Sequence, residues 1–401
     1  MVEPAFTDPG SAPGRPGNQG RRHDPKRYLW PLAAVVPGLV VLSWLAVKVT
    51  GLSWFWWLGP VLAFVLMPLL DHLVGTDSSN PAEGAYVDLD RDPWYRWATC
   101  LYLPNQYLSL VFACWVFSGG GWVALSVADR LGLLVTVGIV GGIGINAAHE
   151  LGHKNARLER RLSRAALAQT CYGHFAVEHN RGHHARVATP DDPASSMLGQ
   201  SLYRFIGRSV IGGLRSAWGL EARRLARHGR SPWTLQNDVL STWLTSAALF
   251  AGLAVWFGPV VLPLLAGQAV VGVGLLEAVN YIEHYGLRRA RLPDGRYERV
   301  STQHSWNANT LVANIFLFHL QRHSDHHTNP QRRYQNLRSV QTAPQLPAGY
   351  GTMLMLALVP PLWRRVMDPR VIAHYAGRIE LAALDPRRRD HLLRVHETRA
   401  A

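Results

Sequence analysis

The chain has 401 residues, of which 48% are hydrophobic, and its 41 Lys and Arg against 27 Asp and Glu give a formal net charge of +14. The apolar residues form runs too long and unbroken for soluble strands or helices, so a membrane protein is favoured over two or three soluble domains. The basic surplus favours anionic lipid headgroups or an acidic protein partner. Nucleic acid is a weaker fit and we expect none, because the arginines flank hydrophobic spans and no nucleic-acid motif is found.

The N-terminal residues 1–27, rich in Pro, Gly and Arg, predict a disordered basic tail, and no signal-peptide cleavage site follows the first apolar run. Six apolar runs follow, each near the length of about 20 residues that crosses a bilayer. They are expected at about 28–47, 52–70, 98–118, 131–148, 239–257 and 260–282.

The positive charges predict the orientation of these spans. They concentrate in the N-terminal tail, in residues 149–238 and after residue 284, whereas the turns at Gly51, 119–121 and Gly258 carry almost none. Arg130 is a small exception. Six spans then place both termini on the cytoplasmic side, in a bacterial cytoplasmic (inner) membrane.

The fourth apolar run ends in His149 and His153, which are four residues apart and share one helix face with Asn146. These histidines also match the HExxH signature of zinc proteases, in which Glu150 is the general base. An intramembrane zinc protease is therefore a competing hypothesis. It leaves seven further clustered histidines unexplained, because a catalytic zinc takes three protein ligands.

Three more histidine clusters lie on the same predicted side of the membrane. His179 and His183 repeat the spacing of four, and His284 ends the sixth span with Glu277 and Tyr281 on its face. About four to six donors satisfy one ion, so nine histidines predict two ions, and imidazole ligands alone allow Zn, Cu, Fe or Ni. The predicted ligands are His149, His153, His179, His183, His184, His284, His323, His326 and His327.

Several polar residues adjoin these ligands and are expected to orient them, since metal-bound imidazole usually donates its other N–H to an oxygen. Direct metal ligation by these carboxylates is the less favoured alternative. Glu277, inside an apolar span, is interpreted as an orienting or proton-handling group, or as a pairing group within the bundle. The set comprises Asn146, Glu150, Glu178, Glu277, Glu283 and Asp325.

Four stretches carry a resemblance to the integral-membrane alkane 1-monooxygenases (alkane omega-hydroxylases), within the wider group of membrane histidine-box hydroxylases and desaturases. They are HELGHK at 149–154, EHNRGHHARVATPDDPAS at 178–195, NYIEHYGL at 280–287 and HLQRHSDHHTNPQRRYQ at 319–335. The similarity runs from about residue 28 to 372. None of the nine histidines departs from the pattern, and Thr328, where the family often has Ala, is a conservative difference.

This resemblance implies two Fe ions, O2 as co-substrate, no haem or flavin in this chain, and hydroxylation of the terminal carbon of an n-alkane to a 1-alkanol. Electrons are expected from a separate rubredoxin and its NAD(P)H-dependent reductase. Cys100, Cys114 and Cys171 lack a CxxC spacing, which excludes a fused rubredoxin and a zinc ribbon in this chain.

The apolar substrate would enter from the bilayer between the helices. In the second span Ala63, Phe64 and Met67 are the candidate passage, and the small Gly59 and Ala63 leave room for a long chain, which predicts medium-to-long alkanes. The tryptophans at 54–57 of the same span are better interpreted as an interfacial belt.

The predicted fold class is therefore all-α, a polytopic bundle of six transmembrane helices with a cytoplasmic helical cap that carries the histidines. Residues 28–372 form the hydroxylase domain and 373–401 a cytoplasmic tail, while the apolar run 353–363 is too short to span and should lie in the interface. Two alternatives to an alkane hydroxylase remain besides the protease: a related hydroxylase or desaturase for a fatty-acyl, methyl-aromatic or terpene substrate, and a metal transporter, whose ligands should spread along the membrane normal.

Overall fold

The computed structural model describes residues 24–400, and within them helices and loops make up the chain, with only isolated β-bridges. This confirms the all-α class. Six helical segments are long and apolar enough to cross a membrane, as predicted. They are Trp30–Thr50, Ser53–Val74, Pro93–Phe117, Val127–Gly152, Asp238–Phe257 and Pro259–His284.

Several of these segments are built from more than one helix. The first joins a 3-10 helix, Trp30–Gly38, to α1, and the second joins α2 and α3 through a π-helical turn at Leu62–Leu66. The spanning helices are α1 (Leu39–Thr50), α2 (Leu58–Val61), α3 (Met67–Val74), α5 (Pro93–Cys100), α6 (Tyr102–Phe117), α7 (Val127–Gly152), α12 (Asp238–Phe257) and α13 (Leu262–His284).

Helix α7 is the centre of the bundle. Its most apolar stretch is 83% buried, against 17% to 56% for the other spans. It begins four residues before the predicted start because Ser126 and Asp129 form a capping box. Glycines bring α7 against α13, since a Cβ at Gly138 would lie 2.5 Å from the Val271 side chain.

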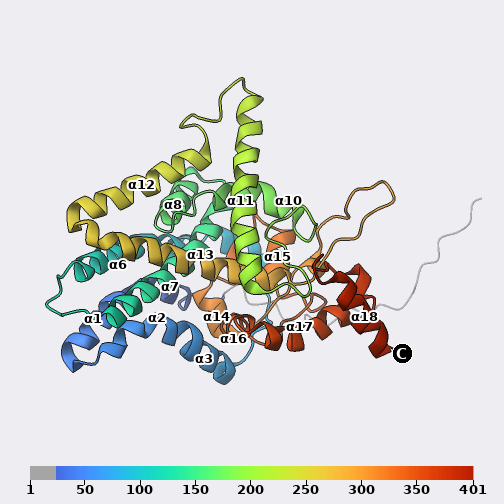
Figure 1. The fold of residues 1–401 in the computed structure, drawn as a ribbon, viewed down its shortest axis with the longest axis horizontal. Helices are drawn as coiled ribbons and strands as arrows, with labels where there is room; N and C mark the ends of the chain where they lie inside the picture. The colour runs from blue at the N-terminus through green and yellow to red at the C-terminus, as the bar shows by residue number, and fades with distance from the viewer. Residues whose placement is uncertain (1–23, 401) are drawn as a thin grey trace, which may run out of the picture.

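The remaining helices gather at the end of the bundle where α7 and α13 finish (Figure 1). The short apolar run predicted at 353–363, which Pro360 and Pro361 interrupt, is divided between two of them, α16 and α17. They are α4 (Tyr86–Arg91), α8 (Arg157–Ala168), α9 (Phe175–Glu178), α10 (His184–Arg186), α11 (Leu202–Ala226), α14 (Leu311–Phe316), α15 (His323–Thr328), α16 (Tyr350–Ala357), α17 (Pro360–His374) and α18 (Arg389–Ala400).

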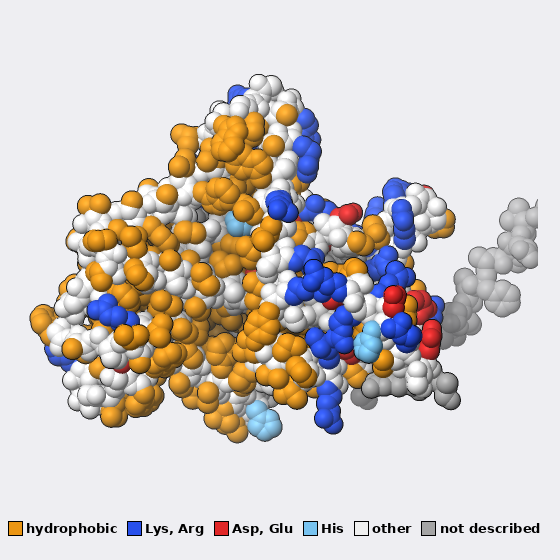
Figure 2. Space-filling view, in the orientation of Figure 1, with side chains coloured by type: hydrophobic (Ala, Val, Ile, Leu, Met, Phe, Trp, Pro, Cys, Tyr) orange, Lys and Arg blue, Asp and Glu red, His pale blue; other side chains and the backbone are white. Residues whose placement is uncertain are grey.

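Side-chain chemistry divides the molecule in the same way. Hydrophobic side chains cover the half that holds α1, α6, α7, α12 and α13, whereas most of the visible Lys and Arg gather around α11, α15, α17 and α18 (Figure 2). The long apolar helices and this exposed apolar surface make the chain a multi-pass membrane protein.

The two predicted tails contain residues that pack on this framework. Most of the predicted N-terminal tail, residues 1–23, lies outside the described residues, but Lys26 pairs with Asp77 at 2.7 Å. In the predicted C-terminal tail, the backbone N–H of Asp385 donates to Leu198, and its carboxylate pairs with Arg204. These contacts between distant segments are not visible in the local composition of either tail.

Candidate metal centre

The nine clustered histidines converge at the end of α7 and α13 in two groups, and the candidate ligand atoms of each group lie within 4.8 Å of one another. We call them the five-histidine group and the four-histidine group. The first comprises His149, His153, His179, His184 and His326, and the second comprises His183, His284, His323 and His327.

Helical geometry distributes neighbouring histidines between the groups. Adjacent residues on a helix point about 100° apart, so His183 joins the four-histidine group while His184 joins the other. The turn His179–His183 is π-helical, which widens the helix at this position, as is frequent at functional sites. On α15, His323 and His327 are one turn apart and share the four-histidine group.

The imidazole nitrogens of the five-histidine group surround a common point. The Nε2 atoms of His149 and His326 are 3.0 Å apart, and those of His326 and His184 are 3.1 Å apart. The Nε2 atom of His179 lies 3.0 Å from those of both His184 and His153. Two imidazoles bound at right angles, at about 2.1 Å from one ion, place their nitrogens about 3.0 Å apart, so this spacing fits a shared cation.

The four-histidine group has the same spacing. Its Nε2–Nε2 distances are 3.3 Å for His183 and His327, 2.9 Å for His327 and His323, and 3.2 Å for His323 and His284. A carboxylate also approaches this group, because Oε2 of Glu283 lies 3.2 Å from Nε2 of His323.

Burial favours the neutral form of these imidazoles. Loss of solvent lowers the pKa of His179, His326 and His327 well below its ordinary value, and neighbouring histidines lower it further. Neutral imidazole is the form that offers a lone pair to a metal ion. Both groups are therefore suited to cation binding.

Asp192, which the sequence analysis did not single out as a site residue, supports the four-histidine group. Its Oδ2 atom lies 2.9 Å from Nδ1 of His183 and accepts a hydrogen bond from Ser195 at 2.6 Å. Burial raises the pKa of Asp192, but His183 and these hydrogen bonds outweigh burial and lower it to about 2. The residue stands in the motif quoted at 178–195, but nine positions from His183, where helical spacing gives no signal.

Three carboxylates predicted to orient the ligands have basic partners instead. Glu150 pairs with Lys154 at 2.9 Å, Glu178 with Arg186 at 2.7 Å, and Asp325 with Arg332 at 2.6 Å. An ionised carboxylate in a buried setting pairs with an available cation, and adjacency in sequence to a ligand does not encode such a pair.

The other predicted orienting residues occupy three different settings. Glu283, besides its approach to His323, accepts a hydrogen bond from Tyr350 at 2.7 Å. The amide of Asn146 donates to the carbonyl of Leu317 at 2.8 Å. Glu277 accepts a hydrogen bond from Tyr172.

The position of Glu150 also bears on the protease hypothesis. Its Oε1 atom accepts hydrogen bonds from the backbone N–H of Tyr334 and from Lys154. A carboxylate held in this way is not placed as a general base for a metal-bound water.

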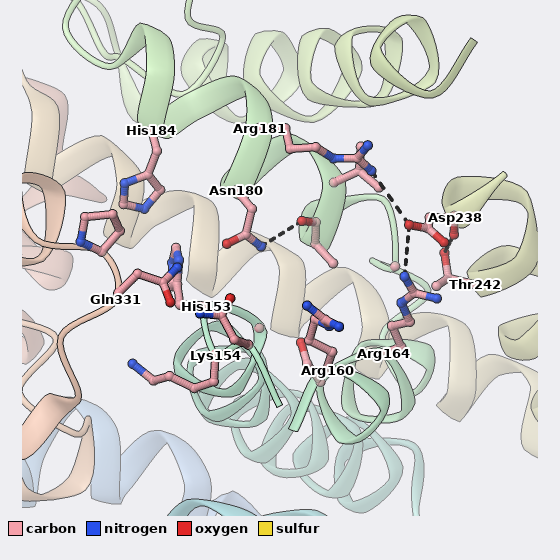
Figure 3. Close-up of a pocket in the computed structure, with 17 residues that line it drawn as sticks. His153, Lys154, Arg160, Arg164, Asn180, Arg181, His184, Asp238, Thr242 and Gln331 are labelled. Atoms are coloured by element: carbon pink, nitrogen blue, oxygen red, sulfur yellow. Dashed lines mark hydrogen bonds and ion pairs between the residues drawn. The ribbon is translucent and has the colours of Figure 1, made fainter. Parts of the chain in front are cut away.

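A polar pocket opens beside the five-histidine group (Figure 3). His153 and His184 are in its wall, and Lys154, Arg160 and Arg164 contribute positive charge. Asp238 neutralises part of that charge by pairing with Arg164 at 2.9 Å. The pocket thus gives water and small polar molecules access to one of the two histidine groups.

A separate apolar cavity lies between the second span and α7, α13 and α16. All three residues of the predicted passage, Ala63, Phe64 and Met67, line it. The close approach of α16 to the second span needs glycine, since a Cβ at Gly351 would lie 2.8 Å from the carbonyl oxygen of Ala63. The other lining residues are Ile139, Gly142, Ile143, Asn146, Leu275, Leu276, Val279, Leu317, Leu320, Tyr350 and Leu354.

Hydrogen-bonded side chains link the wall of the apolar cavity to the histidines. Tyr350 lines the cavity and donates to Glu283, which in turn approaches His323. Asn146 lines the same cavity, one turn of α7 before His149. The cavity therefore lies next to the histidines.

Fold and site together define a multi-pass membrane protein with a histidine-rich metal site. The fatty acid desaturase family model matches residues 110–357, which include all nine histidines. The chain is 42% identical over 376 residues to an alkane 1-monooxygenase of Acinetobacter baylyi, covering 93% of this chain and 91% of that protein. The chain belongs to the alkane 1-monooxygenase family.

Two further relatives match most of the chain. An alkane 1-monooxygenase of Ectopseudomonas oleovorans is 41% identical, with 94% of each chain covered. The hydroxylase component of a xylene/toluene monooxygenase of Pseudomonas putida is 28% identical over 77% of this chain and 80% of that protein.

Proposed function

We propose that this chain is a non-haem di-iron monooxygenase that hydroxylates the terminal carbon of medium-to-long n-alkanes, using O2, to give 1-alkanols. The observation that carries the proposal is the arrangement of the histidines into two groups of closely spaced nitrogens beside an apolar cavity. The family to which the chain belongs supports alkanes as the substrate class.

The donor sets are compatible with iron, and the larger one exceeds what zinc takes. Structural zinc takes four ligands, whereas the larger group offers five imidazoles. Imidazole donors suit iron as well as zinc, copper and nickel. When bound, two iron ions would supply the activation of O2. The residues of this chain hold the metals, keep the surrounding imidazoles neutral and orient His183 through Asp192.

The apolar cavity supports a linear, apolar substrate. Its walls offer side chains such as Ile143, Leu276 and Leu320, and dispersion contacts with them stabilise an alkyl chain that enters from the bilayer. Because Asn146 and Tyr350 lie at the part of the cavity near the histidines, a chain bound lengthwise would present one end to the metal centre. Selectivity for the terminal carbon would follow from this geometry.

Electrons are proposed to come from a separate rubredoxin, reduced by an NAD(P)H-dependent reductase. The polar pocket supports this assignment, because Arg160, Arg164 and Arg181 surround an opening next to the five-histidine group. A basic rim attracts an acidic carrier and speeds its approach.

The proposed location is the bacterial cytoplasmic membrane, with both termini and the metal centre on the cytoplasmic side. The charge distribution supports this, since Lys and Arg concentrate around the histidine-bearing end of the bundle (Figure 2). Positively charged segments are retained in the cytoplasm during insertion.

Metal analysis and turnover of the same purified sample test the proposal. We expect about two iron ions per chain and formation of 1-alkanols from alkanes between octane and hexadecane, with rubredoxin, its reductase and NAD(P)H supplied. Iron-replete protein that oxidises no alkane in this range would contradict the substrate assignment. A different result would support the protease: one zinc ion per chain, with proteolytic activity that is lost in Glu150→Gln and kept in His323→Ala.

A second substrate class has one observation in its favour, namely the similarity to the xylene/toluene monooxygenase component. A hydroxylase for methyl-aromatic compounds would use the same metal centre. Competition between hexadecane and p-xylene would separate the two, because preferential oxidation of p-xylene would favour this alternative.

A further inference from the structure

A small buried polar cavity lies between α9, α11 and α13 and shares no lining residue with the apolar cavity. His179 and His183 line it, so it borders both histidine groups. The histidines that line the polar pocket, His153 and His184, both belong to the five-histidine group. The remaining lining residues are Tyr172, His174, Phe175, Glu178, Pro193, Ala194, Ser209, Gly213, Glu277 and Asn280.

Several side-chain atoms around the buried polar cavity lack a hydrogen-bond partner in the protein. They include both ring nitrogens of His174. Oε2 of Glu178 and Oε2 of Glu277 also lack a well-aligned hydrogen bond, although Ser216 lies near Glu178, and Ser209 and Asn280 lie near Glu277. His174, Glu178 and Glu277 are 5%, 6% and 2% exposed, respectively, so bulk solvent does not satisfy them. Buried polar atoms are almost always hydrogen-bonded, either to protein or to ordered water. The cavity is therefore a site for bound water.

Glu277 gives the buried polar cavity an acid–base group. It is the first charged residue of α13, and its other oxygen, Oε1, accepts a hydrogen bond from the phenol of Tyr172. The ring of Tyr172 lies 4.5 Å from that of His174. An ionisable group inside an apolar span is costly to bury and commonly marks a proton or ion pathway.

The proposed reaction needs such a pathway. One oxygen atom of O2 enters the C–H bond of the alkane, and the other leaves as water, which takes two electrons from the carrier and two protons from the solvent. The walls of the apolar cavity are hydrocarbon apart from Asn146 and Tyr350. The open polar pocket can bring protons to the five-histidine group, whereas the buried polar cavity borders both histidine groups. A route that serves both groups therefore leads through the buried polar cavity.

We propose that the buried polar cavity holds water and that Glu277, together with Tyr172 and His174, passes protons through this water to the metal centre. The inference rests on the proposed function for its role in turnover. The presence of exchangeable water beside Glu277 does not depend on that function.

The hydration of the buried polar cavity is tested without turnover. Infrared difference spectra between wild type and Glu277→Gln isolate the carboxyl bands of Glu277, and transfer to D2O shows whether its environment exchanges. We expect the bands to shift within minutes of transfer. Bands unchanged after hours would show a sealed, dry carboxyl group and would overturn the proposal.

The role in proton delivery is tested by turnover of Glu277→Gln, with Glu159→Gln as the control. Glu159 is also a buried glutamate, but it pairs with Arg333 outside this cavity. Loss of a positioned proton donor lowers rates by about 100-fold or more. We expect kcat of Glu277→Gln to fall by about 100-fold, with iron content and the KM for alkane unchanged and with a larger solvent isotope effect.

A smaller decrease in kcat is expected for Tyr172→Phe, which removes one hydroxyl group and keeps the ring. A Glu277→Gln protein with wild-type kcat and isotope effect would overturn the proposal, as would loss of iron without any change in the rate per iron. If wild-type protein oxidises no alkane, the proposed function fails, and the infrared exchange still decides whether the cavity is hydrated.

Discussion

The two histidine groups are built from the same side chain but lie in different surroundings. The five-histidine group borders the polar pocket, and its His184 is partly exposed, whereas all four members of the other group are buried. The four-histidine group is approached by Glu283, which links it through Tyr350 to the apolar cavity. The five-histidine group is therefore the more accessible to polar molecules, and the four-histidine group is the more enclosed.

The largest effect is expected from removing a ligand, and it should differ between the groups. His323→Ala leaves three imidazoles in its group, while His153→Ala leaves four. We expect both variants to lose alkane oxidation, and His323→Ala to lose its ion more completely. Iron analysis and turnover check this, with the exposed His72→Ala as the control. Full iron content and activity in His323→Ala would contradict the assignment.

Asp192→Asn should weaken metal binding in the four-histidine group alone. The carboxylate holds the ring of His183, and losing such an outer partner typically lowers metal affinity by about 10-fold to 100-fold. Chelator titration of the purified protein measures the effect. The neighbouring Asp191 is exposed, so Asp191→Asn is the matched control. Equal loss of both ions, or loss of neither, would contradict the claim that Asp192 supports the four-histidine group alone.

Filling the apolar cavity with a larger side chain should lower the turnover of long alkanes and leave the metal content unchanged. Ala63→Trp adds a large side chain to the cavity wall, and we expect turnover of hexadecane to fall by about 10-fold, with a smaller change for octane. Val65 is in the same span but is 56% exposed and outside the cavity, so Val65→Trp is the control. If both alkanes decline equally, the cavity does not select chain length.

Replacing a positive side chain at the polar pocket with a negative one should weaken only the binding of the electron carrier. Arg160 is exposed at this pocket, and Arg160→Glu is expected to raise the KM for rubredoxin several-fold at low salt. The difference from wild type should shrink as salt screens the charges. Arg370→Glu on α17, away from the pocket, is the control. An unchanged KM at low salt would place the carrier elsewhere.

The smallest effect is expected on the stability of the fold, from an ion-paired carboxylate outside the metal centre. Burial raises the pKa of Glu221, but hydrogen bonds from Arg224, the backbone N–H of Asp238 and Arg181 outweigh burial and lower it from 4.5 to about 2. A lowered folded-state pKa stabilises the fold above pH 4.5, and this contribution disappears as pH falls towards about 2. Thermal melting of Glu221→Gln should therefore show a lower Tm than wild type at pH 7 and a smaller difference near pH 3. A constant difference would contradict the assigned pairing.

Much of the fold could be predicted from local sequence signals. Apolar length gave the six spans to within a few residues, and the helical spacing of His149 and His153 placed both on one face. The three predicted passage residues of the second span line one apolar cavity, although a π-helical turn at Leu62–Leu66, which the sequence did not signal, sets their directions.

The division of the site into two groups could not be predicted in this way. It depends on how α15 docks against α7 and α13, so that His326 joins His149, which lies 177 residues earlier in the chain. The contact between Asp192 and His183, and the pairing of Asp325 with Arg332, likewise arise from chain folding that no helical period encodes. Local patterns identified the ligand types, and tertiary packing determined their partners.

An iron-edge anomalous scattering map of the purified protein tests the central claim most directly. The account predicts two iron peaks, one among the nitrogens of the five-histidine group and one among those of the four-histidine group. A single peak, a peak at the zinc edge only, or iron bound away from these histidines would contradict it.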